Sequence, residues 1–479
     1  MNRQFLTYSL SRLSMIFSVL MLFPVLVGLI YSEPVSYILN FLLPAVVTFV
    51  IGLILYRKTE FKRVFNTKDA LSLVAICWIL YSVIGAIPMY LYPWDFKSFF
   101  DALFESVAGF STTGATIARD VEELPHSIIF WRSFSQFIGG LGIIAFTVAI
   151  LPKQSRKSSM IMKAESPGPT FGKITPKVSD QSKVLVQIYL AMTTITILLL
   201  WMGDLDLFDS IIYGLGAAGT GGFSNKNASI GYYNSVYTEL VLSVAMFLFS
   251  INFNIYYFMV FKRANNFYKS EELKWYMAIL VISIILIFIN TYKLYEDVSR
   301  QLVSVIFSVT STSSTTGYVG MDTSRWPVFS RLILGALMYV GGMAGSTAGG
   351  VKTSRAVILI KSIINQVREV TNQNRVTTVD FERKNVGEKT EKAVLSYIIL
   401  HFLIFLILLA IISLDQDDFI EAFTAVATTY NGLGQFGDAQ TFYEWSRLSK
   451  SVLSVAMMLG RLEIYPILLL FVPSTYKSN

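Results

Sequence analysis

The sequence is poor in charge, in cysteine and in histidine. Charged residues make up 15% of its 479 residues, whereas soluble proteins carry about 25%. The single cysteine, Cys77, excludes an internal disulfide and a cysteine metal cluster, and its place inside an apolar run favours a packing role. The two histidines, His126 and His401, are assigned structural roles, the first at a membrane interface and the second within a helix.

These shortages argue against a membrane enzyme. An acyltransferase would carry an aspartate five residues after its histidine, but Trp131 stands five residues after His126. Two histidines also leave no Ser/His/Asp set and no metal cluster in view. We therefore expect no enzymatic activity and no cofactor bound by this chain.

Apolar residues dominate what is present. They make up 53% of the chain, its mean hydropathy is +0.55, and many apolar runs reach about 20 residues, the length of a membrane-spanning helix. The first run, residues 5–31, is long, lacks a small-residue cleavage pattern and continues into a second span, so we interpret it as a retained helix. The sequence predicts an all-α polytopic membrane protein.

The net charge of +7 is placed in linkers between the apolar runs. Basic and acidic linkers alternate, which is the positive-inside pattern of membrane proteins. We therefore expect both termini on the cytoplasmic side of an inner membrane, contacts between basic linkers and anionic lipid headgroups, and no nucleic-acid partner. The basic linkers are residues 56–63, 152–163, 261–269 and 352–392, and the acidic linkers contain Asp204, Asp206, Asp209, Asp415, Asp417, Asp418 and Glu421.

Internal repetition organises the chain. After two spans at residues 9–31 and 37–56, four units follow, each with an apolar span, a shorter helix, a hydroxyl/glycine stretch and a second apolar span. Such units run parallel to one another, and four parallel units close most naturally into a pseudo-fourfold ring. The predicted parts are an N-terminal helix pair (1–68), pore repeats 1 (69–152), 2 (183–262), 3 with a broken second helix (273–363) and 4 (392–479), and a cytosolic linker (364–391).

The short helices are too brief to cross the bilayer. Non-helical backbone at membrane depth is tolerated only where it faces protein or a watery cavity, so the surrounding spans are expected to enclose a pore or a binding site. The short helices are expected at residues 98–110, 208–218, 299–312 and 417–429, before the stretches "VAGFSTTGAT", "GAAGTGGFSN", "FSVTSTSSTTGYVG" and "AVATTYNGLGQFG".

These stretches suit a dehydrated cation, because converging backbone carbonyls can replace its water. Aiming successive carbonyls at one axis needs positive φ, which favours glycine, and the short helices would point their partly negative C-terminal ends at the same axis. Tight helix packing is the alternative for one such stretch, but four copies favour a selectivity filter. The filter position of the fourth stretch stays open between Gly432 and Gly434. The candidate cation ligands are Thr112, Thr113, Gly114, Thr220, Gly221, Gly222, Thr315, Thr316, Gly317, Asn431, Gly432, Leu433 and Gly434.

The stretch "VGGMAGSTAGGVK" interrupts the second span of repeat 3 with five glycines, each costing a helix about 1 kcal/mol relative to alanine. It approaches the phosphate-binding pattern GxxxxGK[ST], but Val351 stands at the lysine position and no strand precedes it. We predict an unwound loop lying across the pore beneath the filter, with a glycine-lined helix crossing as the alternative. The candidate gate residues here are Gly341, Gly342, Gly345, Ser346, Thr347, Gly349, Gly350 and Lys352.

Arg461 is a second gate candidate, because it lies well inside the last apolar span. A charge at that depth is costly and usually faces a bundle interior or a water-filled cavity. We predict that Arg461 points into the conduction path, repels a resting cation and holds the glycine loop through its carbonyls. A buried Arg–Glu pair between helices is the alternative; Glu463 lies on a different helix face and is not an automatic partner.

Five motifs resemble the Trk/Ktr potassium-uptake family and its fungal Trk and plant HKT relatives: "GFSTTGAT", "GTGGFSN", "STTGYVGMDTSRWP", "YVGGMAGSTAGGVK" and "LGRLEIYPILLL". The two extra N-terminal spans resemble the bacterial Trk membrane subunits. The resemblance implies potassium as the transported ion, a homodimer, a cytosolic RCK-type nucleotide-binding subunit, and a gate role for the glycine loop. Glycine at the filter position of repeat 1 resembles potassium-selective members, whereas Leu433 departs from the pattern of the fourth loop.

The transport mechanism admits two interpretations. We favour a passive, channel-like uptake subunit driven by the membrane potential, because the long apolar segments hold few acids and the repeats are parallel. A secondary potassium symporter coupled to protons or sodium is the alternative, and it would call for carboxylates as proton relays.

Overall fold

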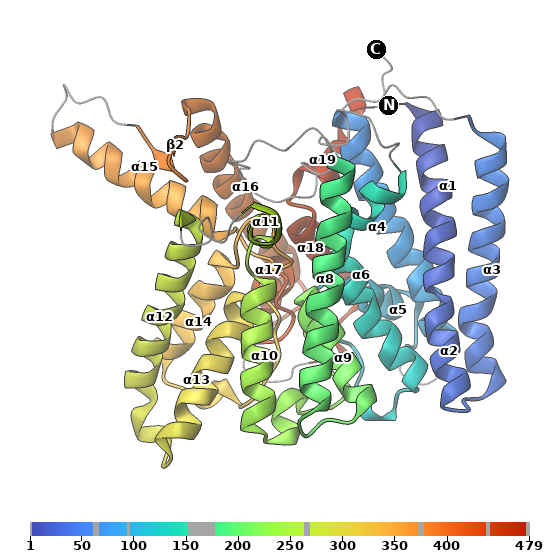
Figure 1. The fold of residues 1–479 in the computed structure, drawn as a ribbon, viewed down its shortest axis with the longest axis horizontal. Coiled ribbons are helices and arrows are strands. Elements are labelled where there is room, and N and C mark those ends of the chain that lie inside the picture. Colours follow the sequence, from blue (N-terminus) through green and yellow to red (C-terminus); the bar gives the residue numbers. More distant parts are fainter. Residues whose placement is uncertain are drawn as a thin grey trace.

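The computed structural model is a bundle built almost entirely of helices (Figure 1). Within its described residues the strands are β1 (Asp380–Phe381) and β2 (Lys384–Asn385), a short antiparallel hairpin. The linker 152–163 lies outside the described residues, and the linkers 261–269 and 364–391 are described only in part. The described residues are 2–60, 67–92, 96–150, 178–262, 269–371, 378–436 and 441–475.

Two N-terminal spans lie at one edge of the bundle (Figure 1). The first consists of α1 (Arg3–Leu20) and α2 (Leu22–Ile30), and the second is α3 (Val35–Lys58). Only 28% of the apolar window of α3 is buried inside the protein. The rest of its apolar surface is therefore left for lipid.

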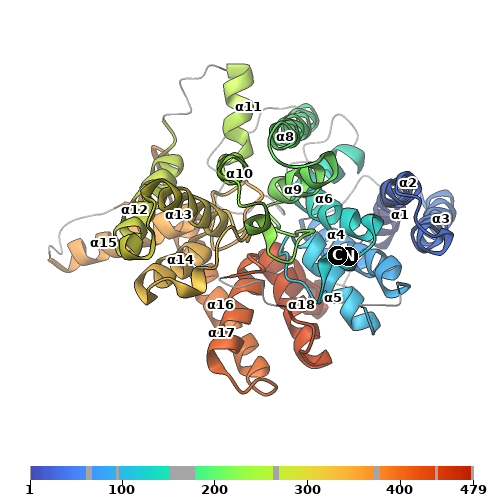
Figure 2. The same cartoon turned by 90° about the horizontal axis from the view of Figure 1, so that it is seen from below.

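Four helix–loop–helix segments follow one another around a common centre, as the view along the bundle shows (Figure 2). Each begins with a long apolar helix that crosses the bundle, in agreement with the expected first spans. These helices are α4 (Thr67–Tyr90), α8 (Val178–Trp201), α12 (Glu271–Thr291) and α16 (Glu388–Ile412).

A short helix then follows in each segment, within two residues of the expected bounds. Acidic side chains cap these helices: Asp101 closes a capping box with Ser98, and Asp206 and Asp418 accept backbone N–H groups at the next N-termini. Asp209 lies in the first turn of its short helix, inside the range 208–218 that was expected for this helix. The short helices are α5 (Phe99–Phe110), α9 (Leu207–Gly219), α13 (Val298–Ser313) and α17 (Phe419–Asn431).

The second helices depart from the expectation, which placed a break only in the third segment. A helix bends by 89° between Phe249 and Phe253 in the second segment, and another bends by 120° between Arg461 and Tyr465 in the fourth. Glu463 and Ile464 adopt positive φ (56° and 68°), which ends the regular helix there. The second helices are α6 (His126–Ile150), α10 (Val236–Phe249) with α11 (Phe253–Lys262), α14 (Val328–Val340) with α15 (Thr353–Thr371), and α18 (Arg447–Arg461) with α19 (Tyr465–Phe471).

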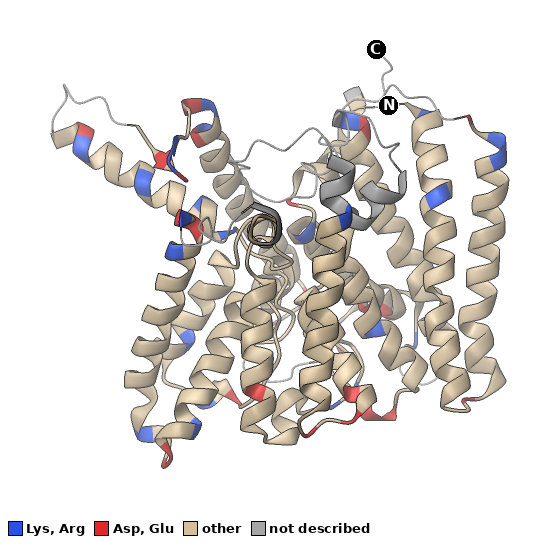
Figure 3. Ribbon diagram, viewed as in Figure 1, with Lys and Arg blue, Asp and Glu red and all other residues tan. Residues whose placement is uncertain are grey.

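The described residues contain six helices that are long and apolar enough to span a membrane, or up to eight if each bent pair is one span. The start of α1 and the end of α19 lie at the same end of the bundle (Figure 1). Acidic residues lie along several turns at the opposite end (Figure 3). The chain is a multi-pass membrane protein.

Aromatic packing joins the N-terminal pair to the first segment. Phe17 of α1 stacks on Tyr81 of α4 with ring centroids 4.5 Å apart, and Trp131 of α6 lies edge-on to both Phe17 and Phe110 at 5.9 Å. The Trp131 indole donates to the carbonyl of Gly85 (3.0 Å). The cluster fixes α4, α5 and α6 against one another at the start of the first polar loop.

Close packing of α18 on α17 gives a test of the fold. A Cβ on Gly460 would lie 2.0 Å from the carbonyl oxygen of Tyr430, whereas a Cβ on Gly335 in α14 would meet nothing within 4 Å. We expect Gly460→Ala to destabilise the protein by about 1–3 kcal/mol through overpacking. Gly335→Ala should leave stability unchanged or slightly raised. Thermal unfolding of the two purified variants in detergent checks this, and equal melting temperatures would contradict the packing.

Candidate functional site

The four loops after the short helices share one backbone design. In the first loop, the N–H groups of Thr113 and Gly114 both donate to the carbonyl of Ala108 (2.9 and 3.1 Å). In the third loop, the N–H groups of Thr316 and Gly317 donate in the same way to the carbonyl of Ser311 (2.9 and 3.4 Å). In the fourth loop, the N–H groups of Leu433 and Gly434 donate to the carbonyl of Thr428 (2.9 and 3.4 Å). In the second loop, the Gly221 N–H donates to the carbonyl of Gly216 (2.9 Å). Each loop is thus held to the last turn of its own helix.

Each loop also has two left-handed residues separated by one position. In the first loop they are Thr112 (φ 55°) and Gly114 (φ 78°), and in the fourth they are Gly432 (φ 78°) and Gly434 (φ 72°). The open register is therefore resolved, because Gly434 takes the place of Gly114 and Leu433 that of Thr113. Positive φ in a β-branched threonine is strained, and such strain persists where the surroundings hold it. The other two pairs are Thr220 (φ 53°) with Gly222 (φ 77°) and Thr315 (φ 55°) with Gly317 (φ 82°).

The loops meet one another in cyclic order. A Cβ on Gly114 would lie 1.8 Å from the carbonyl oxygen of Gly221 in the second loop. The equivalent glycines of the second, third and fourth loops lie equally close to a carbonyl of the next loop. These contacts are Gly222 to Thr316 (2.0 Å), Gly317 to Leu433 (2.0 Å) and Gly434 to Thr113 (2.2 Å), which returns to the first loop. The four stretches, up to 320 positions apart in the chain, therefore converge at one place.

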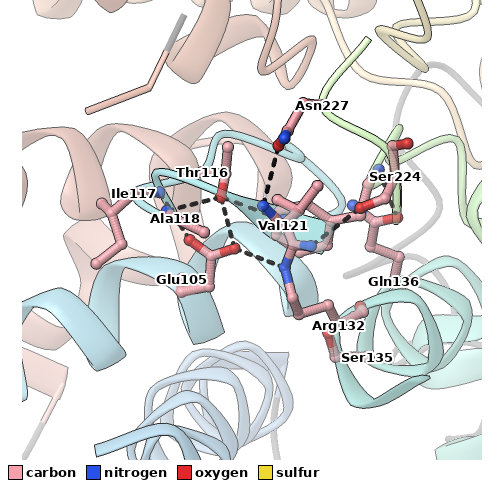
Figure 4. Close-up of polar contacts among 11 residues, drawn as sticks. Glu105, Thr116, Ile117, Ala118, Val121, Arg132, Ser135, Gln136, Ser224 and Asn227 are labelled. Atoms are coloured by element: carbon pink, nitrogen blue, oxygen red, sulfur yellow. Dashed lines mark hydrogen bonds and ion pairs between the residues drawn. The ribbon is translucent and has the colours of Figure 1, made fainter. Parts of the chain in front are cut away.

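A buried ion pair supports the first two loops from behind (Figure 4). The Arg132 guanidinium in α6 lies 2.7 Å from the Glu105 carboxylate in α5, and both side chains are almost fully buried. Glu105 also accepts from the Thr116 hydroxyl and the Ile117 N–H, both at 2.9 Å. Arg132 donates to the carbonyl of Ser224 (3.0 Å). The pair thus joins the end of the first loop to the end of the second.

Gln136, one turn further along α6, lies between the same two loops. Its side-chain oxygen accepts from the Phe223 N–H at 3.2 Å. A Cβ on Gly221 would lie 2.3 Å from its amide carbon, and one on Gly114 would lie 3.3 Å from its amide nitrogen. The amide therefore fills the space behind both loops and limits how far they can move apart.

Other buried ion pairs connect neighbouring segments. Lys450 of α18 donates to Asp101 of α5 (2.7 Å), which joins the fourth segment to the first. Arg300 of α13 donates to Glu239 of α10 (2.7 Å), which joins the third segment to the second. Removing one partner of such a pair would leave the other charge buried without its counter-charge, which is destabilising.

A polar pocket of about 70 Å³ opens beside the first two loops, lined by Gly114, Gly222 and Lys226 among others. The Lys226 ammonium lies 3.7 Å from the Glu122 carboxylate, so its charge is partly balanced. Hydrogen bonds from the Asn227 amide and the Glu122 N–H lower the pKa of Asp120 at the same mouth. The pocket itself is lined by the basic side chains Arg119, Arg132 and Lys226, whose charges are balanced by carboxylates outside its lining.

The glycine-rich stretch between α14 and α15 is an unwound loop, residues 341–352, as predicted. Gly341, Gly345 and Gly350 have positive φ (66°, 75° and 78°), and so has Lys352 (81°). A short neck closes the loop, because Thr353 N–H donates to the carbonyl of Gly342 (3.0 Å). The buried Lys352 ammonium donates to the carbonyl of Ala348 within the loop. A continuous glycine-lined helix crossing is excluded.

This intramembrane loop is anchored on several sides. Met343 N–H donates to the carbonyl of Ser250 at the bend between α10 and α11 (3.0 Å). The Thr347 hydroxyl donates to the carbonyl of Phe249 (3.1 Å). The Ser346 hydroxyl donates within the loop to Met343 (2.7 Å). The buried carboxylate of Glu272, in the first turn of α12, accepts from the Ala344 N–H (2.8 Å) and so ties the loop to α12.

Arg461 ends α18 beside this loop. Its guanidinium donates to the carbonyl of Thr347 (2.7 Å) and to the carbonyl of Gly139 in α6 (2.6 Å). It thus contacts the loop through a carbonyl, in the manner expected from its position. Glu463 bonds Arg355 of α15 at 2.6 and 3.1 Å instead of serving as a simple helix neighbour of Arg461.

Sequence reasoning missed most of the supporting side chains. Arg132 and Glu105 lie in apolar stretches and carry the same signal that singled out Arg461, namely a charge where lipid or protein must surround it. Gln136 and Glu272 carry no such signal, because one is uncharged and the other lies at the polar start of a span. Both histidines are structural as expected: His126 stacks on Tyr31 (3.9 Å) and His401 on Tyr430 (4.3 Å).

The fold and the converging loops define a multi-pass helical membrane protein with a polar centre built from main chain. Residues 38–478 match the model of the TrkH family, whose members are described as cation transport proteins. The chain therefore belongs to the TrkH family of cation transport proteins.

Named relatives extend over the whole chain. The Trk system potassium uptake protein TrkG of Escherichia coli K12 is 30% identical over 481 residues, 98% of each chain. TrkH of the same organism is 30% identical over 486 residues and covers 100% of each. The crystal structure of the potassium transporter TrkH from Vibrio parahaemolyticus superposes with a TM-score of 0.89 at 28% identity, covering 100% of both chains.

The buried Glu105–Arg132 pair gives a second prediction. Glu105→Gln leaves the Arg132 cation buried without its counter-charge, so we expect the free energy of unfolding to fall by about 3–5 kcal/mol. The control is Glu388→Gln, whose partner Lys392 is mostly exposed, and it should cause no measurable change. Thermal unfolding and the yield of monodisperse protein report both. A Glu105→Gln protein as stable as the control would remove the pair as a support of the loops.

Proposed function

We propose that this chain takes up potassium across the cytoplasmic (inner) membrane through a channel-like pore, with both termini in the cytoplasm. The observation that carries the proposal is the cyclic meeting of the four loops. The named relatives are potassium uptake proteins, which supports potassium as the cation. The driving force would be the membrane potential, about 2.3 kcal/mol per elementary charge per 100 mV.

The converging loops would act as a selectivity filter formed by the four pore repeats, residues 69–152, 183–262, 273–363 and 392–479. Main-chain carbonyls would replace the water of a dehydrated potassium ion. The C-terminal ends of the short helices point into the loops, and their partial negative charge favours a cation. The candidate ligands are Thr112, Thr113, Gly114, Thr220, Gly221, Gly222, Thr315, Thr316, Gly317, Asn431, Gly432, Leu433 and Gly434.

The intramembrane loop and Arg461 would form the gate. The loop is not part of a regular helix and has glycines near its ends, so it could leave the path without unfolding a helix. Arg461 adds a positive charge beside it, which opposes a cation. Release of the loop would therefore open the conduction path.

Control would come from a cytosolic RCK-type nucleotide-binding subunit acting on the basic linkers, and the chain would work as a homodimer. The α15 helix supports this view, because it continues directly from the intramembrane loop and reaches the hairpin β1–β2. Lys361 on α15 donates to the carbonyl of Asp380 in that hairpin (2.6 Å). A partner that moves the hairpin would thereby move the loop.

Complementation tests potassium uptake. The wild-type gene should restore growth of a potassium-uptake-deficient bacterium at low external potassium. Gly317→Asp should abolish it, because its φ is 82° and a Cβ there would lie 2.0 Å from the Leu433 carbonyl oxygen. Ser324→Asp is the matched control, since it adds the same charge at an exposed position nearby. Failure of the wild type to support growth while present in the membrane would reject the function.

A rubidium flux assay tests the role of Arg461. In vesicles that contain the purified protein without a partner subunit, Arg461→Ala should raise resting ⁸⁶Rb⁺ flux at least about tenfold, the effect of losing one charge-assisted hydrogen bond to the loop. Arg461→Lys should give an intermediate flux, because it keeps the charge and loses the second donor. Unchanged rate and regulation in Arg461→Ala would remove it from the gate.

A further inference from the structure

The intramembrane loop is hydrogen-bonded directly to the filter loops. Gly349 N–H donates to the hydroxyl oxygen of Thr315 in the third filter loop at 2.6 Å. Gly350 N–H donates to the carbonyl oxygen of Asn431, at the start of the fourth, at 3.1 Å. The loop therefore contacts Thr315, which begins the left-handed turn of the third filter loop, and Asn431, which directly precedes that of the fourth.

This contact is close along the backbone as well. A Cβ on Gly349 would lie 2.3 Å from the Asn431 carbonyl oxygen and 3.1 Å from the Thr315 hydroxyl oxygen. Thr315 itself is fully buried, and its left-handed φ of 55° is held by the bond from its N–H to Thr312 (3.1 Å). The backbone that carries this hydroxyl is therefore held in place next to the loop.

The contact is also particular to one side of the filter. Thr112 and Thr220 occupy the place of Thr315 in the first two loops, and Gly432 occupies it in the fourth, where there is no side chain. Among the described residues, the hydrogen bonds from the intramembrane loop to the filter loops go to Thr315 and Asn431 alone. The three threonines therefore hold equivalent positions in their loops, but of their hydroxyls only that of Thr315 accepts a hydrogen bond from the intramembrane loop in the part of the chain that the structure describes.

We propose that the permeating cation and the closed intramembrane loop compete for the Thr315 hydroxyl oxygen. In the closed state Gly349 N–H occupies it. In the open state the same oxygen faces the innermost cation of the filter. This assignment rests on the proposed function, and it makes Thr315 a positioning residue for the gate.

The physical reason is electrostatic. A hydroxyl oxygen can accept a hydrogen bond and ligate a cation with different lone pairs, but the positive end of the N–H dipole, already 2.6 Å from that oxygen, would then face the cation at close range in a buried site. A cation that settles at the inner end of the filter therefore weakens the Gly349 bond. Conversely, a closed loop lowers the affinity of the inner cation site, because such coupling is reciprocal.

Permeant cation should thus favour opening. Raising potassium would increase the fraction of open loops as well as the number of ions available, so flux at low potassium would rise more steeply than in simple proportion. A large organic cation that cannot enter the filter would have no such effect.

The test compares two threonines in purified full-length protein reconstituted into vesicles. Thr315→Val removes the acceptor of the loop and one filter hydroxyl, and resting ⁸⁶Rb⁺ flux should rise about fivefold, the shift expected from losing one ordinary hydrogen bond. Thr112→Val removes an equivalent filter hydroxyl that has no bond to the loop, so resting flux should fall through the lost cation ligand and should not rise. Thr315→Ser keeps the hydroxyl and should restore the wild-type resting flux.

A second readout follows the loop itself. Ser346→Cys places a thiol on the loop in a chain whose native Cys77 is buried, and its rate of modification by a water-soluble thiol reagent reports loop release. We expect potassium to accelerate modification severalfold over the same concentration of a large organic cation. In a Thr315→Val background the rate should be high and independent of potassium, whereas in a Thr112→Val background it should stay potassium-dependent.

The outcomes separate this inference from the function. If wild-type vesicles carry no rubidium or potassium, the proposed function fails. If they carry it but Thr315→Val and Thr112→Val change flux alike, and potassium leaves the modification of Ser346→Cys unchanged, the function stands and the competition for Thr315 is rejected. If Thr315→Val does not reach the membrane, the potassium dependence of Ser346→Cys modification decides the question by itself.

Discussion

The contact of four glycines with four carbonyls of neighbouring loops is the constraint on which the rest of the structure depends. At Gly114, Gly222, Gly317 and Gly434 the next loop comes so close that any Cβ would collide with a carbonyl oxygen. Those loops can meet only if the short helices behind them are aimed inward and the long helices outside hold them there. The arrangement of the bundle therefore follows from the need to bring main-chain oxygens together without side chains between them.

Support for this centre is unequal around the ring. The first two loops rest on the buried Glu105–Arg132 pair and on Gln136. The third and fourth loops instead meet the intramembrane loop through Thr315 and Asn431. Half of the ring is thus held by fixed side chains, and the other half is held by a segment with little regular structure.

The intramembrane loop also links the centre to the end of the bundle that carries the termini. Glu272 joins it to α12, Arg461 joins it to α18, and its last residue leads into α15. The contact with Arg461 crosses to the fourth segment, whereas α12 and α15 belong to the third segment together with the loop. The hairpin β1–β2, which bonds Lys361 of α15, is thereby connected through α15 and the intramembrane loop to Thr315 and Asn431.

Composition and repetition determined the class of the protein, because apolar length and charge alternation are properties of the chain itself. The positions of the four short helices followed from the same pattern, and Arg461 was found because a charge in an apolar span is conspicuous. Tertiary structure alone decided the rest. The register of the fourth loop depended on the φ angles of Gly432 and Gly434. The bend after α10 has no proline or glycine to announce it, and the bend after α18 lies between Gly460 and Pro466, which the sequence analysis did not interpret as a break. Gln136 and Thr315 resemble many other buried polar residues in the sequence. They gain their roles only from partners more than 30 positions away, which local pattern cannot reveal.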